Sequence, residues 1–116
     1  MHDDSGPDRP VSHLLIESQG GGPGDMGSRF IEDAAQLARS GHPVQLLLIQ
    51  NGVVAAAGDD SPAQSLVDAG GELWVDSFSL AQRGMASARL LRAAQTVEMP
   101  EISARLLDPG VRVVWH

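Results

Sequence analysis

The polar segment from residue 76 to residue 83 holds the side chains best suited to chemistry. It follows a short apolar stretch, residues 72–75, that is typical of a buried strand. Its polar side chains are those of Asp76, Ser77, Ser79 and Arg83. In an open parallel sheet, ligands bind at the carboxyl ends of the strands. A carboxylate placed there, beside a helix start and an arginine, is suited to bind a ligand or to act as an acid or base.

The same side chains have ordinary structural uses, and the sequence leaves both interpretations open. Ser79 would cap a short helix, while Asp76 or Ser77 would accept hydrogen bonds from free backbone N–H groups. Arg83 would pair with Asp76 or with an adjacent subunit.

The predicted pocket also includes Asn51 and Gly52. These two residues follow the preceding predicted strand and form a strand-to-helix turn. The carboxyl ends of parallel strands meet at one edge of a sheet, which brings this turn toward the polar segment.

The composition excludes several classes of chemistry. The 116 residues include no cysteine, so thiolate nucleophiles, disulfides and cysteine-ligated metals are ruled out. The net charge is −7 and every basic residue is an arginine, so no basic face is available for nucleic acid. Residues 1–10 are too polar for a signal peptide, and no apolar run has membrane-spanning length. We therefore expect a soluble, cytoplasmic protein that binds neither nucleic acid nor membranes.

A glycine-rich loop has the glycine spacing of a cofactor-binding motif, but we predict no cofactor there. Gly22, Gly24 and Gly27 have the spacing of a dinucleotide-binding loop. Pro23, however, removes one amide donor, and Asp25 adds a negative charge where an anion would bind. We interpret the match as coincidental.

The histidines and serines show no metal-binding or catalytic pattern. The histidines are His2, His13, His42 and His116, and no two have the spacing of metal ligands. We interpret His13 as a strand side chain with one hydrogen bond. No serine lies in the G-x-S-x-G turn of a serine hydrolase. We expect neither a metal nor a cofactor.

Strand and helix patterns alternate after a polar, flexible tail, residues 1–10. Short apolar stretches predict strands at residues 11–17, 44–49, 72–75, 95–98 and 111–115. Helices are predicted at residues 28–40, 61–69, 79–84, 87–93 and from residue 100, with a helical turn at 53–57. Ser61 and Ser79 have the spacing of capping boxes, with glutamine three residues later. Strands that alternate with helices at this spacing imply right-handed crossovers. We predict one three-layer α/β/α domain, residues 11–116, with a five-stranded, mainly parallel sheet.

Five short segments, taken in order, resemble those of a known family. They are Leu37–Val44, Asn51–Val53, Leu66–Val75, Ala81–Met85 and Met99–Glu101. The set is similar to the DsrE/DsrF-like family, the small α/β proteins of sulfur-relay systems, and the resemblance covers residues 11–116. It implies a five-stranded parallel sheet with helices on both sides. It also implies homo-oligomers, often trimers or hexamers, or hetero-oligomers with DsrE-like relatives.

The resemblance also implies where a binding site lies, but the residues at that position cannot carry out the family's usual reaction, persulfide transfer. Family members that transfer sulfur carry a cysteine just after the third strand, a few residues before Arg-Gly, where it takes up a persulfide. Matching the strand ends puts Asp76 at the cysteine position, with Ser77 as the alternative match. Neither side chain can hold sulfane sulfur. The resemblance therefore implies the position of the pocket and a tendency to assemble, without persulfide transfer.

Three functions follow from these observations. The leading hypothesis is a DsrE-like protein, related to sulfur-relay subunits, that acts by assembly or ligand binding. The alternative is a small-ligand binding protein or enzyme that uses Asp76, Ser77 and Arg83. A third is a structural partner of a cysteine-bearing homologue. Trp115 is expected to pack at a subunit contact, where tryptophan is favoured.

Overall fold

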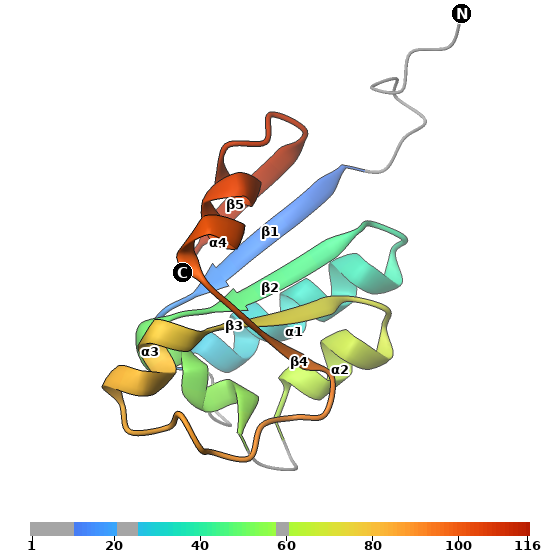
Figure 1. Ribbon diagram of the computed structural model, residues 1–116. Coiled ribbons are helices and arrows are strands. Elements are labelled where there is room, and N and C mark those ends of the chain that lie inside the picture. Colours follow the sequence, from blue (N-terminus) through green and yellow to red (C-terminus); the bar gives the residue numbers. More distant parts are fainter. Residues whose placement is uncertain (1–10, 21–25, 58–60) are drawn as a thin grey trace, which may run out of the picture.

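The computed structural model describes residues 11–20, 26–57 and 61–116, in which strands alternate with helices (Figure 1). The strands are β1 (Ser12–Glu17), β2 (Val44–Leu48), β3 (Glu72–Asp76), β4 (Ala94–Val97) and β5 (Val111–Trp115). The helices are α1 (Met26–Arg39), the 3₁₀ helix η1 (Gln50–Ala56), α2 (Ala63–Asp68), α3 (Ser77–Gln82) and α4 (Met99–Leu106). The predicted tail, residues 1–10, and residues 21–25 of the glycine-rich loop lie outside the described residues.

The strands form one sheet in the order β4-β3-β2-β1-β5, and every neighbouring pair is parallel. The α/β prediction is confirmed, with a sheet that is wholly parallel. From β1 to β4 the chain moves across the sheet in one direction, and β5 then returns to the other side of β1. Because crossovers between parallel strands are right-handed, this reversal places the last helix on the opposite face from the earlier ones.

Two apolar clusters cover the two faces of the sheet. On one face, α1 and α2 pack over Leu15 and Leu46. On the other face, α4 packs through Ile102 against Leu14 and Leu47. Figure 1 shows α1 and α2 behind the sheet and α4 in front of it. Successive side chains of a strand point to opposite faces, so each nearly continuous apolar strand serves both clusters.

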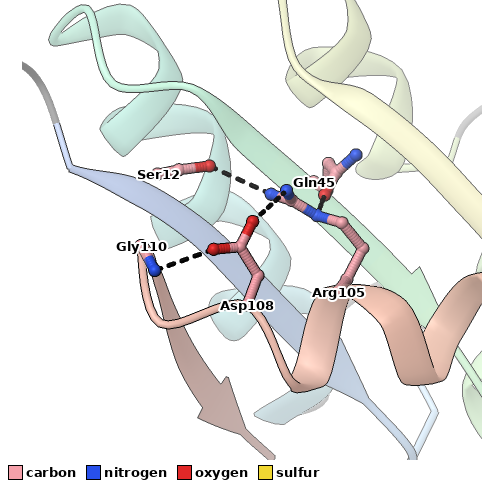
Figure 2. Close-up of polar contacts among 5 residues, drawn as sticks. All are labelled: Ser12, Gln45, Arg105, Asp108 and Gly110. Atoms are coloured by element: carbon pink, nitrogen blue, oxygen red, sulfur yellow. Dashed lines mark hydrogen bonds and ion pairs between the residues drawn. The ribbon is translucent and has the colours of Figure 1, made fainter. Parts of the chain in front are cut away.

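Arg105, near the C-terminal end of α4, forms hydrogen bonds to two strands of the sheet (Figure 2). The guanidinium of Arg105 donates from Nε to Gln45 at the start of β2 and from Nη2 to Ser12 Oγ, 3.0 Å away, at the start of β1. Its Nη1 lies 3.6 Å from Asp108 Oδ2, and Asp108 Oδ1 accepts from the Gly110 N–H at 2.8 Å. Because β1 and β2 begin there, this network lies at the edge of the sheet opposite to the predicted pocket.

The predicted helix at residues 87–93 is wrong. This segment consists of turns and extended backbone. The Leu91 N–H donates to Ala56 O at 2.7 Å, and Leu90 pairs with Ala57 in an antiparallel bridge. Both leucines pack against the α1-side core while extended. The end of η1 therefore supplies the hydrogen bonds that a helix would otherwise provide.

Neither Ser61 nor Ser79 forms the capping box that its spacing predicts. Helix α3 begins two residues earlier, at Ser77, with Asp76 as its N-cap. Pro62 holds the N-cap position of α2 without a side-chain cap. The Ser61 hydroxyl donates to Ala55 O and accepts from the Ala63 N–H at 3.2 Å, and no bond to the third residue of a capping box is formed. A reciprocal capping box is found in α4, where Glu98 and Glu101 cap each other's backbone.

Among the helices of the described residues, none is long and apolar enough to cross a membrane.

Candidate functional site

Asp76 ends β3 with a buried carboxylate that starts the next helix. Its side chain is 5% exposed. Oδ2 accepts hydrogen bonds from the Ser79 backbone N–H at 3.1 Å and from Ser79 Oγ at 2.6 Å. A side-chain oxygen at the N-cap satisfies a backbone donor that the first turn of a helix leaves without a partner. The helix-capping interpretation of Asp76 is therefore correct as far as Oδ2 is concerned.

The other oxygen of the same carboxylate has no such explanation. Asp76 Oδ1 is buried, and among the residues that the structure describes it has no hydrogen-bond partner. Leaving a buried polar group without a partner costs about 1–3 kcal/mol. Capping α3 requires only Oδ2, so the capping role does not account for the position of Oδ1.

Ser79 joins the end of β3 to the segment that follows β2. Its side chain is 3% exposed, and its hydroxyl donates to Asp76 Oδ2 while accepting from the Gln50 N–H at 2.8 Å. The donor and the acceptor of this hydroxyl are thus both occupied, which does not suit a nucleophile. Gln50 has a φ of 51°, the left-handed region that residues other than glycine rarely adopt. Such backbone strain costs about 1–3 kcal/mol and clusters at functional sites.

Arg83 contacts Asn51 and not Asp76. Its Nε donates to Asn51 Oδ1 at 3.1 Å, and its Nη1 donates to Ser79 O at 3.4 Å. The predicted pairing of Arg83 with Asp76 is therefore not what the structure shows. Arg83, which is half-buried, instead connects the end of α3 to the start of η1.

The other two predicted pocket residues have different surroundings. Ser77 is the half-buried first residue of α3. Gly52 is buried against β1, where an added Cβ would lie 2.1 Å from Glu17 O. Only glycine permits this close approach of η1 to β1. The structure thus brings Asp76 to Ser79 and Asn51 to Arg83, whereas Gly52 contacts Glu17.

A second polar pair lies at the same edge and was missed by sequence reasoning. Glu17 has 0% exposure, and its Oε1 lies 2.8 Å from His116 Nδ1. Its Oε2 accepts from the Gln19 N–H at 2.7 Å. A glutamate at the end of a strand predicted to be buried was a usable signal, because a buried carboxylate requires a partner. The partner could not be identified because it lies 99 residues away.

The remaining described histidines meet at the opposite end of β1. The ring centroids of His13 and His42 are 5.3 Å apart, with the rings edge to face. His13 Nδ1 donates to Val11 O at 3.0 Å, as the single-hydrogen-bond interpretation requires. Burial lowers the pKa of His13 below its ordinary value of 6.5; His42 and Arg112 lower it further, and the bond to Val11 opposes them. Within the described ranges, no group of three or more potential ligands is placed to hold a metal ion.

Comparison with known proteins supports the fold and leaves the function open. No family model matches the sequence, and no match was found among curated proteins. Among solved structures, the crystal structure of the YchN protein from E. coli superposes with a TM-score of 0.72 and 15% sequence identity. The match covers 90% of this chain and 99% of that protein. YchN has a DsrE-like fold, and at this identity the similarity shows fold alone. The chain therefore has the DsrE-like α/β fold that the sequence resemblance implied.

Proposed function

We propose that this protein is a cysteine-free relative of the DsrE-like sulfur-relay subunits, and that it binds a small ligand at the Asp76 cluster. By this cluster we mean Asp76, Ser79, Arg83, Asn51 and Gln50. The observation that carries the proposal is Asp76 Oδ1, which is buried and finds no hydrogen-bond partner in the described part of the chain. The sequence resemblance matches this strand end to the family's cysteine position. A ligand that donates a hydrogen bond to Oδ1 would remove the free-energy cost of that unpaired oxygen.

The geometry around Asp76 favours a ligand with an N–H or O–H donor. The Ser79 hydroxyl and the Ser79 backbone N–H hold the carboxylate in one orientation, so little ordering is required on binding. The strained backbone of Gln50, joined to Ser79, is a further sign of a functional site. Arg83, which is half-buried and donates to Asn51 and to Ser79 O, would contact a polar group of the ligand.

A cysteine placed at residue 76 tests whether the family's site has been retained. We expect Asp76→Cys, incubated with a small-molecule persulfide, to gain the mass of one sulfur atom. Ser77→Cys tests the alternative match, and Ser87→Cys, on an exposed turn, reports unspecific uptake. If Asp76→Cys gains no more sulfur than Ser87→Cys, the site is not built for that chemistry and the family relationship at this position fails.

Ligand binding itself is tested on the natural residue. Wild-type protein and Asp76→Asn, purified from the native host side by side, would be compared by native mass spectrometry. We expect a small molecule on the wild type that is absent from Asp76→Asn, because the amide cannot provide two acceptor oxygens. The same occupancy in both proteins would refute ligand binding by Asp76.

Assembly is a second proposal, favoured by a separate observation. A five-stranded parallel sheet is normally covered on both faces, yet on the α4 side the structure provides one short helix. Large apolar side chains are exposed on α4, on the turn after it and on β5: Leu106, Leu107, Val113 and Trp115. We name these four residues the α4–β5 surface. Leu107 is 83% exposed and Trp115 60%, which is typical of an interaction surface.

The proposed partner of the α4–β5 surface is a second copy of the chain or a DsrE-like relative that carries a cysteine. Analytical ultracentrifugation should show a trimer or hexamer for the wild type and smaller species for Trp115→Ala. Phe78→Ala removes an equally exposed aromatic side chain from α3 and is the matched control. A monomeric wild type that also fails to co-purify with a cysteine-bearing relative would contradict the assembly proposal.

A further inference from the structure

The pair formed by Glu17 and His116 lies where the order of strands reverses. The chain moves from β1 across to β4, whereas β5 lies on the other side of β1. In open α/β sheets, ligands bind outside the carboxyl ends of the strands at this reversal. Ile16 is paired with Trp115, so the next residues of the two strands, Glu17 and His116, lie side by side at that point.

The imidazole of His116 is held in place from three directions. Its Nδ1 donates to the fully buried Glu17 carboxylate at 2.8 Å. Its ring stacks on Phe30 of α1, with centroids 5.1 Å apart and planes 20° apart. Its backbone N–H donates to Ile16 O at 2.8 Å, and its backbone oxygen accepts from both the N–H and the hydroxyl of Ser18. A catalytic or binding histidine requires such positioning of the ring.

The other ring nitrogen is available. The His116 side chain is 29% exposed, and none of the described residues forms a hydrogen bond with its Nε2. When Nδ1 carries the proton that is donated to a carboxylate, Nε2 of the neutral ring presents a lone pair that can accept a proton or a hydrogen bond. A buried carboxylate that orients an imidazole in this way is the arrangement of a general base.

We propose that Glu17 and His116 form a proton-transfer pair that binds a small molecule through a hydroxyl or thiol group. The O–H or S–H proton of the ligand moves to His116 Nε2. The bond from that proton to the ligand breaks and an N–H bond forms, leaving a phenolate or thiolate next to an imidazolium. The Glu17 carboxylate stabilises the imidazolium.

This pair is separate from the Asp76 cluster. Glu17 points to the same face of the sheet as Leu15, toward α1, whereas Asp76 shares its face with Trp74, toward α4. β2 lies between the strands that carry the two carboxylates. The pair therefore does not depend on the proposed function, and the failure of one proposal would leave the other standing.

Two coloured probes test the proton transfer directly. 4-Nitrophenol and 4-nitrothiophenol change their visible absorbance when they lose the proton, so titration with protein reports both binding and ionisation. At a pH where the free probe is mostly protonated, the bound probe should be about tenfold more ionised, because its anion forms a charge-assisted hydrogen bond to the imidazolium. A response to the phenol alone or to the thiol alone would identify which group the site takes.

Variants assign the response to the pair. His116→Gln should abolish the saturable absorbance change, and Glu17→Gln should weaken it, since the amide cannot stabilise an imidazolium. His13→Gln is the matched control, because His13 lies on the same face of the same strand and donates to a carbonyl instead of a carboxylate. The proposal is overturned if neither probe binds saturably, or if His116→Gln responds like the wild type, or if His13→Gln loses the response equally.

A measurement on the wild-type protein remains decisive even if the variants fold poorly. In protein labelled with ¹⁵N at histidine, adding the probe should move the Nε2 resonance of His116 toward the value of a protonated ring. The resonances of His13 and His42 should stay in place. If the Nε2 resonance of His116 does not move at saturating probe, the proposal is wrong. Asp76→Asn should behave like the wild type in all these experiments, which separates this pair from the Asp76 cluster.

Discussion

Ser79 and Asp76 are joined by a 2.6 Å hydrogen bond that links the start of α3 to the end of β3. The same hydroxyl accepts from Gln50, so its loss affects two elements at once. We expect Ser79→Ala to lower the free energy of unfolding by about 1–3 kcal/mol, because the part-buried Gln50 N–H loses its acceptor and Asp76 Oδ2 loses one of its two donors. Urea unfolding measures the change. Ser77→Ala, on the same helix, should change stability by less than about 0.5 kcal/mol; equal effects of the two substitutions would contradict this account.

Arg105 is the residue that attaches α4 to the starts of β1 and β2. Arg105→Lys keeps the charge but cannot reach Gln45 and Ser12 simultaneously with one ammonium group. We expect the free energy of unfolding to fall by about 1–2 kcal/mol, because Gln45 or Ser12 loses its charged donor. Thermal unfolding measures it, and Arg89→Lys, on an exposed segment, is the control. A lysine variant as stable as the wild type would show that α4 is held by its apolar contacts alone.

Gly52 should be more sensitive to substitution than glycines in left-handed turns. An alanine Cβ at residue 52 would lie 2.1 Å from the Glu17 carbonyl oxygen, which is backbone and cannot rotate away. Overpacking of this kind costs about 1–3 kcal/mol or more. Gly41 has open space around it, so an alanine there meets no atom, and its cost is the strain of a side chain at a φ of 94°, about 1–2 kcal/mol. Chemical unfolding of Gly52→Ala and Gly41→Ala should therefore rank Gly52→Ala as the less stable protein. The reverse order would mean that η1 can move away from β1.

His13 should make the protein less stable in mild acid. Its pKa lies below the ordinary value of 6.5 in the folded state, chiefly because of burial. As the pH falls through 6.5, the unfolded chain takes up a proton that the folded chain does not, so stability falls. Above 6.5 the ring is neutral in both states and the effect vanishes. Melting temperatures measured from neutral pH downward should fall less steeply for His13→Gln. Parallel slopes for the two proteins would rule out a contribution from His13.

Local patterns predicted most of the fold. The 3.6-residue period placed a helix at residues 28–40, and α1 spans Met26–Arg39. Apolar runs between turn signals placed all five strands to within one or two residues. The segment at residues 87–93 was mispredicted because its leucines suit a helix face and an extended core strand equally well. What decides between the two is a contact with Ala56, which lies far away in the sequence.

In the candidate site, too, local contacts could be predicted from the sequence and distant contacts could not. Asp76 was found because a polar residue at the end of an apolar strand is a local signal, and its capping bond spans three residues. The sequence offered Asp76 or an adjacent subunit as the partner of Arg83, whereas within the described chain its side-chain partner is Asn51, 32 residues away. Pairs of this kind depend on the order of strands in the sheet, which residue patterns do not encode.

The position of β5 beside β1 also has a consequence for the synthesis of the protein. Glu17 leaves the ribosome 99 residues before His116, so one side of β1 has no neighbouring strand while the rest of the sheet forms. At roughly 5–20 residues per second, this side remains open for about 5–20 s. An apolar strand with an open side can pair with another nascent chain. The period of greatest risk of misassembly, and of greatest need for a chaperone, therefore falls before β5 is made.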